Sequence, residues 1–129
     1  MQPINPEGWP RPRGYSNGLV AYGRLLFVAG QIGWDDTGVI RSDAFLDQAE
    51  RALRNVLAVV HAAGGRPEHV ARLTWYVTDK REYLACVRDL GKVYRELFGS
   101  HYPVMSLVQV SALLEERARV EIEATAVLP

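Results

Sequence analysis

The stretch VEIEATAV, residues 120–127, decides the fold because it gives the two faces of one strand different chemistry. Apolar and polar side chains alternate along it, which is the period of a strand that buries one face. The set predicted to face helices is Val120, Ile122, Ala124 and Ala126. The opposite face carries Glu121, Glu123 and Thr125. Two carboxylates on one face indicate either a solvated or ion-paired surface or a functional site, and the pattern alone does not choose.

Two more strands with sided patterns are predicted beside it, at residues 70–78 (VARLTWYVT) and 103–110 (PVMSLVQV). In the first, the helix-facing set is predicted to be Leu73, Trp75 and Val77, and the opposite set Arg72, Thr74 and Tyr76. In the second, we expect Val104, Val108 and Val110 to point inward, and Met105, Leu107 and Gln109 outward. The second face of the sheet is then too apolar for a solvated surface and too polar for a core. Such a face favours contact with another subunit.

Earlier in the chain, LVAYGRLLFVAGQIG predicts strands at about 19–22 and 24–32 that meet at Gly23. Residues 1–14 contain four prolines and are predicted to form an irregular arm over the surface. The chain therefore begins with an arm and two adjacent strands.

Two helices are predicted from apolar residues at three- and four-residue spacing. The first spans residues 42–65, with Ser42 and Asp43 as its N-cap and a Gly-Gly pair as its stop. The second spans residues 80–99, with an inward set of Tyr83, Val87, Leu90, Tyr94 and Leu97. The order β-β-α-β-α-β-β predicts one α+β domain over residues 1–129, with two helices on one face of a sheet.

Composition limits the function classes. Fifteen basic residues balance fifteen acidic ones among 129, so nucleic acid is an unlikely partner and a small molecule is the default. A single cysteine and the absence of a signal peptide or membrane span favour the cytoplasm. The three histidines stand apart from other ligand residues, so no metal site is expected. Cys86 lies near the apolar stripe of a predicted helix, where packing is a better interpretation than nucleophilic catalysis.

Five segments, taken together, resemble the Rid (reactive intermediate deaminase) family, also known as RidA, YjgF-like or L-PSP endoribonuclease proteins. They are GYSNG (14–18), FVAGQIG (27–33), AAGG (62–65), YPVMSLVQV (102–110) and VEIEATAV (120–127). The resemblance runs from about Tyr15 to Val127, and the last two segments are its most specific part. It implies a chorismate-mutase-like fold and a homotrimer whose sheets form a central barrel, with three ligand pockets at the subunit junctions. It also implies hydrolysis of reactive enamines and imines without metal or cofactor.

The resemblance also assigns roles to single positions. Glu121 corresponds to the glutamate that holds the attacking water, and the family's substrate-binding arginine falls on Met105. The other expected substrate-binding positions are Tyr15, Gly30, Trp34, Gly91 and Leu107. Gly91 stands where the family has an asparagine, and Leu107 where it has a small polar residue.

Methionine has no hydrogen-bond donor, so Met105 cannot bind a carboxylate as an arginine fork does. Three hypotheses follow. The substrate lacks a carboxylate or has it held elsewhere, for instance by Arg24 or Arg72; the pocket binds a metabolite without chemistry; or it takes a larger aromatic or acyl substrate. We expect a Rid-type hydrolase or deaminase of altered specificity, with a non-catalytic, small-molecule-binding or regulatory trimer as the alternative.

Overall fold

The chain follows the predicted order of strands and helices, with one helix divided in two and one short strand added. The computed structural model describes residues 1–129. Its elements are β1 (Gln2–Ile4), β2 (Gly18–Val20), β3 (Arg24–Gln31), α1 (Phe45–Ala62), β4 (Val70–Val77), α2 (Lys80–Ala85), α3 (Val87–Phe98), β5 (Val104–Gln109) and β6 (Val120–Leu128), with a 3₁₀ turn at Pro67–His69. None of the helices is long and apolar enough to cross a membrane.

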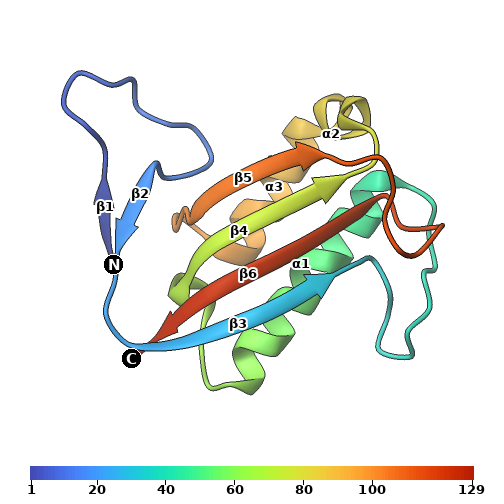
Figure 1. The fold of residues 1–129 in the computed structure, drawn as a ribbon, viewed down its shortest axis with the longest axis horizontal. Coiled ribbons are helices and arrows are strands. Elements are labelled where there is room, and N and C mark those ends of the chain that lie inside the picture. The colour runs from blue at the N-terminus through green and yellow to red at the C-terminus, as the bar shows by residue number, and fades with distance from the viewer.

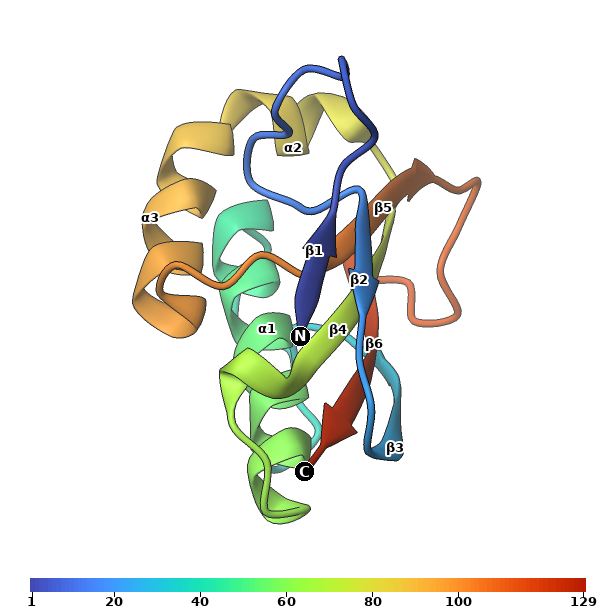
Figure 2. The same ribbon diagram turned by 90° about the vertical axis from the view of Figure 1, so that its left-hand side faces the viewer.

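A four-stranded sheet with the order β3-β6-β4-β5 forms the centre of the structure (Figure 1). β6 pairs antiparallel with both β3 and β4, whereas β5 pairs parallel with β4. A parallel pair needs a crossover connection, which α2 and α3 supply. The helices cover one face of the sheet and leave the other bare, as Figure 2 shows edge-on. We call the bare side the open face. β3 and β5 are the two edges of the sheet, and only the first residue of β5 forms a bridge, with Ser16.

The core lies between the sheet and α1, which packs across β3 and β6. The residues of α1 that are completely buried recur at helical spacing: Ala49, Ala52, Leu53, Val56 and Val60. The residues that β4 and β6 bury are Val70, Leu73, Trp75, Val77, Val120, Ile122, Ala124, Ala126 and Leu128. The predicted helix-facing sets of these two strands are therefore confirmed.

The predicted facing of the strand at 103–110 is wrong. The parallel register pairs Leu73 with Met105 and Trp75 with Leu107, so the members of each pair lie on the same face of the sheet. Met105 and Leu107 pack against the core cluster, while Val108, predicted to be inward, is 44% exposed. Apolar residues occupy both faces of this strand, so the alternation of side chains could not show which face is buried. The register with β4 determines the buried face.

The predicted helix over residues 80–99 is two helices. Asp79 caps α2, with Oδ1 accepting a hydrogen bond from the Arg81 backbone N–H at 2.9 Å. The backbone leaves helical geometry at Cys86, where φ is −123° and ψ is 20°, and α3 begins at the next residue. The break leaves Val87, predicted to be inward, 45% exposed. The buried residues of α3 are Leu90, Val93, Tyr94 and Phe98.

The N-terminal arm is more ordered than predicted. Residues 2–4, expected to be irregular, form β1 and pair antiparallel with β2 in a separate two-stranded sheet. Ser16 anchors the end of the arm beside β5, because its Oγ donates a hydrogen bond to the Tyr102 carbonyl at 2.6 Å and its N–H donates to the Pro103 carbonyl.

The start of the first helix also differs from the prediction. Its N-cap position is Ala44, so α1 begins at Phe45, and neither Ser42 nor Asp43 is the N-cap.

Gln48 connects α1 to the loop before β6 and is only 1% exposed. Its Nε2 donates to the carbonyls of Ser42 and Arg117, and its Oε1 accepts from the Arg119 N–H. Gln48→Ala would leave three backbone groups without these partners. We expect the free energy of unfolding to fall by about 2–4 kcal/mol.

The measurement is urea unfolding at one fixed protein concentration, with the exposed Gln2→Ala as the matched control. The control should change stability by no more than about 0.5 kcal/mol. Equal midpoints for the two variants would contradict the role of the Gln48 amide.

Candidate functional site

Two carboxylates and a phenol lie together on the open face. The Tyr76 hydroxyl donates to Glu123 Oε1 at 2.7 Å, and this hydrogen bond, with burial, raises the pKa of Tyr76. Glu121 is the cross-strand neighbour of Tyr76 in the register of β4 and β6. It makes neither a hydrogen bond nor an ion pair within the chain. Glu123 is therefore committed to a partner, and the Glu121 carboxylate is free.

Glu121 rests on the backbone of Gly30. A Cβ at Gly30 would lie 2.6 Å from both Cδ and Oε2 of Glu121, so only glycine leaves the carboxylate its place. The register of β3 against β6 shifts between Val28 and Gln31, which marks a bulge at this point. The sequence-predicted positions Gly30 and Glu121 are thus in contact.

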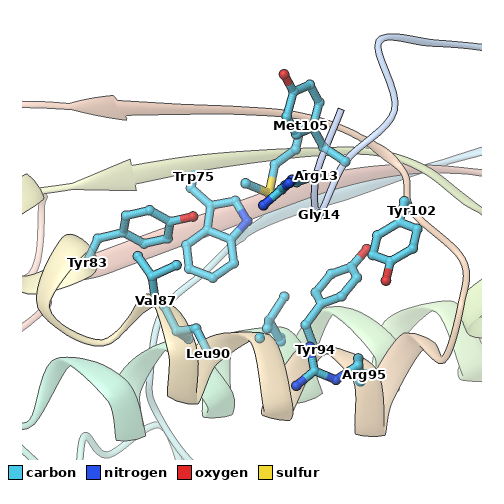
Figure 3. A pocket seen from close by; sticks show the side chains of 13 residues that line it. Arg13, Gly14, Trp75, Tyr83, Val87, Leu90, Tyr94, Arg95, Tyr102 and Met105 are labelled. Atoms are coloured by element: carbon cyan, nitrogen blue, oxygen red, sulfur yellow. The ribbon is translucent and has the colours of Figure 1, made fainter. Parts of the chain in front are cut away.

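A cavity of about 420 Å³ lies on the helix side of the sheet, between β4, β5, α2, α3 and the N-terminal arm (Figure 3). It is within the size range of small-molecule sites. It is lined by Arg13, Gly14, Tyr15, Leu53, Trp75, Tyr83, Val87, Leu90, Gly91, Tyr94, Arg95, Tyr102 and Met105. We call it the arm pocket. Two guanidinium groups line it and no carboxylate does, so it is suited to an anion or an electron-rich group.

Aromatic side chains form two walls of the arm pocket. Trp75 and Tyr83 meet edge-on, with ring centroids 5.9 Å apart, and Tyr94 stacks on Tyr102 at the same separation. Burial raises the pKa of both Tyr83 and Tyr94, so their phenols are neutral near neutral pH. The Trp75 side chain is 3% exposed, and its Nε1 hydrogen has no partner.

The predicted site residues fall into separate groups. Tyr15, Gly91 and Met105 line the arm pocket. Gly30 and Glu121 lie on the open face, on the other side of the same sheet. The remaining two predicted positions, Trp34 and Leu107, belong to neither group.

Trp34 lies in a different hollow with Val39, Ile40 and Leu114, and Leu107 packs against the core. Of the arginines considered as alternative carboxylate partners, Arg24 Nε donates to the Pro129 carbonyl at 3.4 Å. Neither Arg24 nor Arg72 lines the arm pocket.

Sequence reasoning missed Arg13 and Arg95. Arg13 belongs to a proline-rich arm with no helical or strand period, so no spacing related it to Met105. Arg95 lies one turn after Gly91 on α3, and this spacing was the only signal available.

Comparisons with known proteins agree over the full length. Residues 10–128 match the model of the protein family described as Endoribonuclease L-PSP. The chain belongs to the Rid, or L-PSP, family. The chain is 37% identical over 112 residues to the putative reactive intermediate deaminase TdcF of Escherichia coli, covering 84% of this chain and 82% of TdcF.

Solved structures of Rid proteins share the fold. YyfB of Yersinia pestis, from the conserved Rid protein family, superposes with a TM-score of 0.85 at 32% identity, covering 98% of each chain. E. coli TdcF with bound serine gives a TM-score of 0.69 at 35% identity, covering each chain completely. The fold predicted from the resemblance is confirmed.

No cluster of three or more His, Cys, Asp or Glu side chains is arranged to hold a metal ion. Cys86 is half-buried at the junction of α2 and α3, where its Sγ–H donates to the Glu82 carbonyl at 3.3 Å. Burial, reinforced by the Asp89 and Glu82 carboxylates, raises the pKa of its thiol. A thiol with a raised pKa is a poor nucleophile near neutral pH.

We therefore expect iodoacetamide to alkylate Cys86 more slowly than N-acetylcysteine amide, a reference thiol without a free carboxylate, at pH 8, because less thiolate is present. The rate should rise with pH through a midpoint above that of the free thiol, and unfolding in urea should remove the difference. Mass spectrometry of quenched samples measures both rates. Faster alkylation in the folded protein would mean that Cys86 is activated.

Proposed function

We propose that this chain is a Rid-type hydrolase that converts a reactive imine or enamine into a carbonyl compound and ammonia. The observation that supports this most directly is the Glu121 carboxylate, which lies against Gly30 without a protein partner. An uncommitted carboxylate beside backbone groups can orient a water molecule and accept its proton. TdcF, which shares 37% of its residues over 112 positions, is named a reactive intermediate deaminase.

The chemistry needs only a water and an acid–base group. An enamine first tautomerises to its imine by taking a proton at carbon and losing one from nitrogen. Water then attacks the C=N carbon while Glu121 accepts one of its protons; the C–O bond forms, the C=N π bond breaks, and the proton passes from Glu121 to nitrogen. The second water proton moves from the new hydroxyl to nitrogen, the C–N bond breaks, ammonia leaves, and the water oxygen becomes the carbonyl oxygen. A general base of this kind contributes a factor of about 100 to 10,000 to the rate.

The proposal requires more than one subunit. Met105 and Glu121 lie on opposite faces of one sheet, so a single chain does not bring the arm pocket to Glu121. The β3 edge is unpaired, and the open face exposes apolar side chains, with Leu25 61% and Phe27 72% exposed. Burying this face in a trimer would remove the apolar surface from water. For Glu121 to serve the arm pocket, the same assembly must also bring one subunit's open face to the β5 edge of its neighbour, where the pocket opens.

Substrate choice in the proposal follows from Met105. Replacing a bidentate arginine–carboxylate contact by a thioether costs on the order of 2–5 kcal/mol of binding, or a hundredfold or more in affinity. E. coli TdcF has been crystallised with serine, a small amino acid. The smallest imino acids, such as 2-aminoacrylate, have little besides the carboxylate to contribute to binding, so we expect this chain to process them poorly.

Glu121→Gln tests the catalytic assignment. The variant should keep the trimer and lose hydrolysis by about 100-fold or more, because the amide cannot accept the water proton. Light scattering gives the assembly mass, and ammonia release is measured with imines generated from a panel of amino acids by an amino-acid oxidase. Glu116→Gln, a change to an exposed carboxylate, is the matched control and should behave as the parent chain. Dissociation of the trimer with activity retained would make Glu121 an interface residue.

Met105→Arg tests the specificity assignment. The variant should hydrolyse 2-aminoacrylate at least about tenfold faster than the parent chain, since a guanidinium can again bind the carboxylate. It should also be less stable, because an unpaired guanidinium in an aromatic pocket is costly. Met105→Leu keeps the volume and is the control. Rapid turnover of 2-aminoacrylate by the parent chain would show that Met105 is no obstacle.

A further inference from the structure

We infer that Arg13 of the N-terminal arm takes over the carboxylate-binding role that Met105 cannot perform, and that the preferred substrate is an aromatic 2-imino acid. This inference rests on the proposed function, because it names the substrate class of the same site. It is supported by four observations on the arm pocket: a free cation, an unpaired donor, aromatic walls and vacant space.

The free cation that the inference uses is Arg13. Neither Arg13 nor Arg95, the other arginine that lines the pocket, makes an ion pair or side-chain hydrogen bond within the chain, although six ion pairs occupy other arginines. Of the two, Arg13 is the one on the N-terminal arm, whereas Arg95 lies on α3 one turn after Gly91. Arg13, Met105 and Trp75 line the same pocket, and all three are labelled in Figure 3. A guanidinium at this position can form the paired, charge-assisted hydrogen bonds that a carboxylate accepts.

The unpaired donor is the Nε1–H of Trp75. Buried N–H groups almost always have a partner, and leaving one unmade is unfavourable. Trp75 is 3% exposed and its Nε1 has no acceptor in the protein. Because Trp75 and Arg13 line the same pocket, a ligand carboxylate that reaches the buried Nε1–H after a small adjustment of the pocket would satisfy this donor with one oxygen and offer the other to the guanidinium.

The rest of the pocket suits a flat apolar group. Trp75 and Tyr83 form one wall, and Tyr94 with Tyr102 forms the other, in the arrangement seen in Figure 3. Aromatic rings pack favourably edge-on or offset against such walls. A small aliphatic side chain would leave most of the cavity of about 420 Å³ unfilled.

Gly91 provides the space on the helix side. A Cβ at this position would meet only Arg95 Nη1, at 3.4 Å, so no packing reason demands a glycine here. Glycine in a helix interior is unfavourable by roughly 0.5–1 kcal/mol relative to alanine. The absent side chain therefore enlarges the cavity without serving the packing of α3.

Binding is tested apart from catalysis, with full-length Glu121→Gln protein and three stable probes in isothermal titration calorimetry. 3-Phenylpropanoate has the ring and the carboxylate, butanoate has only the carboxylate, and 3-phenylpropanamide has the ring without the charge. We expect 3-phenylpropanoate to bind at least about tenfold more tightly than either of the others. Equal affinity for butanoate would overturn the aromatic preference, and equal affinity for the amide would overturn carboxylate recognition.

Three further substitutions in the same background locate the contacts. Arg13→Gln should weaken 3-phenylpropanoate binding about tenfold or more, and Trp75→Phe, which keeps a ring and removes the N–H, about three- to tenfold. Arg11→Gln, two residues away on the arm and outside the pocket, should leave the affinity unchanged. Circular dichroism checks that each variant is folded. Unchanged affinity in a folded Arg13→Gln variant would overturn the inference.

Turnover separates this inference from the proposed function. With Glu121 present, the imine derived from phenylalanine should be hydrolysed faster than the one derived from alanine. If 3-phenylpropanoate binds through Arg13 but no imine is hydrolysed, the proposed function fails and the ligand class stands. If imines are hydrolysed through Glu121 with no aromatic preference and no effect of Arg13, the function stands and the inference fails.

Discussion

The parallel pairing of β4 with β5 is the constraint on which the candidate site depends. Parallel neighbours in register share a face, so Leu73 and Trp75, which are buried under the helices, determine that Met105 and Leu107 face the helices too. The same pairing requires the crossover through α2 and α3, which forms the outer wall of the arm pocket. The register of β4 with β5 thus determines the side of the sheet on which the arm pocket lies, and the crossover helices α2 and α3 close the pocket on that side.

The antiparallel pairing of β6 places Glu121 on the face of the sheet opposite to Met105. Since Ile122 must be buried, Glu121 points to the open face, where Gly30 leaves room for its carboxylate. The chain therefore divides the proposed chemistry between two faces of one sheet. In the proposed trimer, contact between subunits would reunite the base with the binding pocket, so that assembly and activity depend on the same surface.

The charge distribution supports the proposal that a protein with no net charge binds an anion. The fifteen acidic residues balance the fifteen basic ones over the whole chain. None of the acidic residues lines the arm pocket, whereas two arginines do. Both arginines are exposed to solvent and neither has an ion-pair partner, so their charges remain available to a ligand. Under the further inference, the substrate carboxylate is bound by Arg13 of the arm and not by a residue at the position of Met105 in β5. Ser16 holds the arm beside β5.

The sequence by itself determined the family, the order of the main strands and helices, and the buried faces of β4 and β6, because strict alternation and helical spacing record which side of an element avoids water. The resemblance named Glu121 and Gly30 as site positions, and the structure shows that they are in contact. It did not determine the facing of β5, whose apolar residues lie on both sides, or the break at Cys86, which no glycine or proline marks. Only the tertiary structure placed Arg13 at the pocket and left the Trp75 N–H unpaired, because contacts between distant segments depend on packing and leave no local period in the sequence.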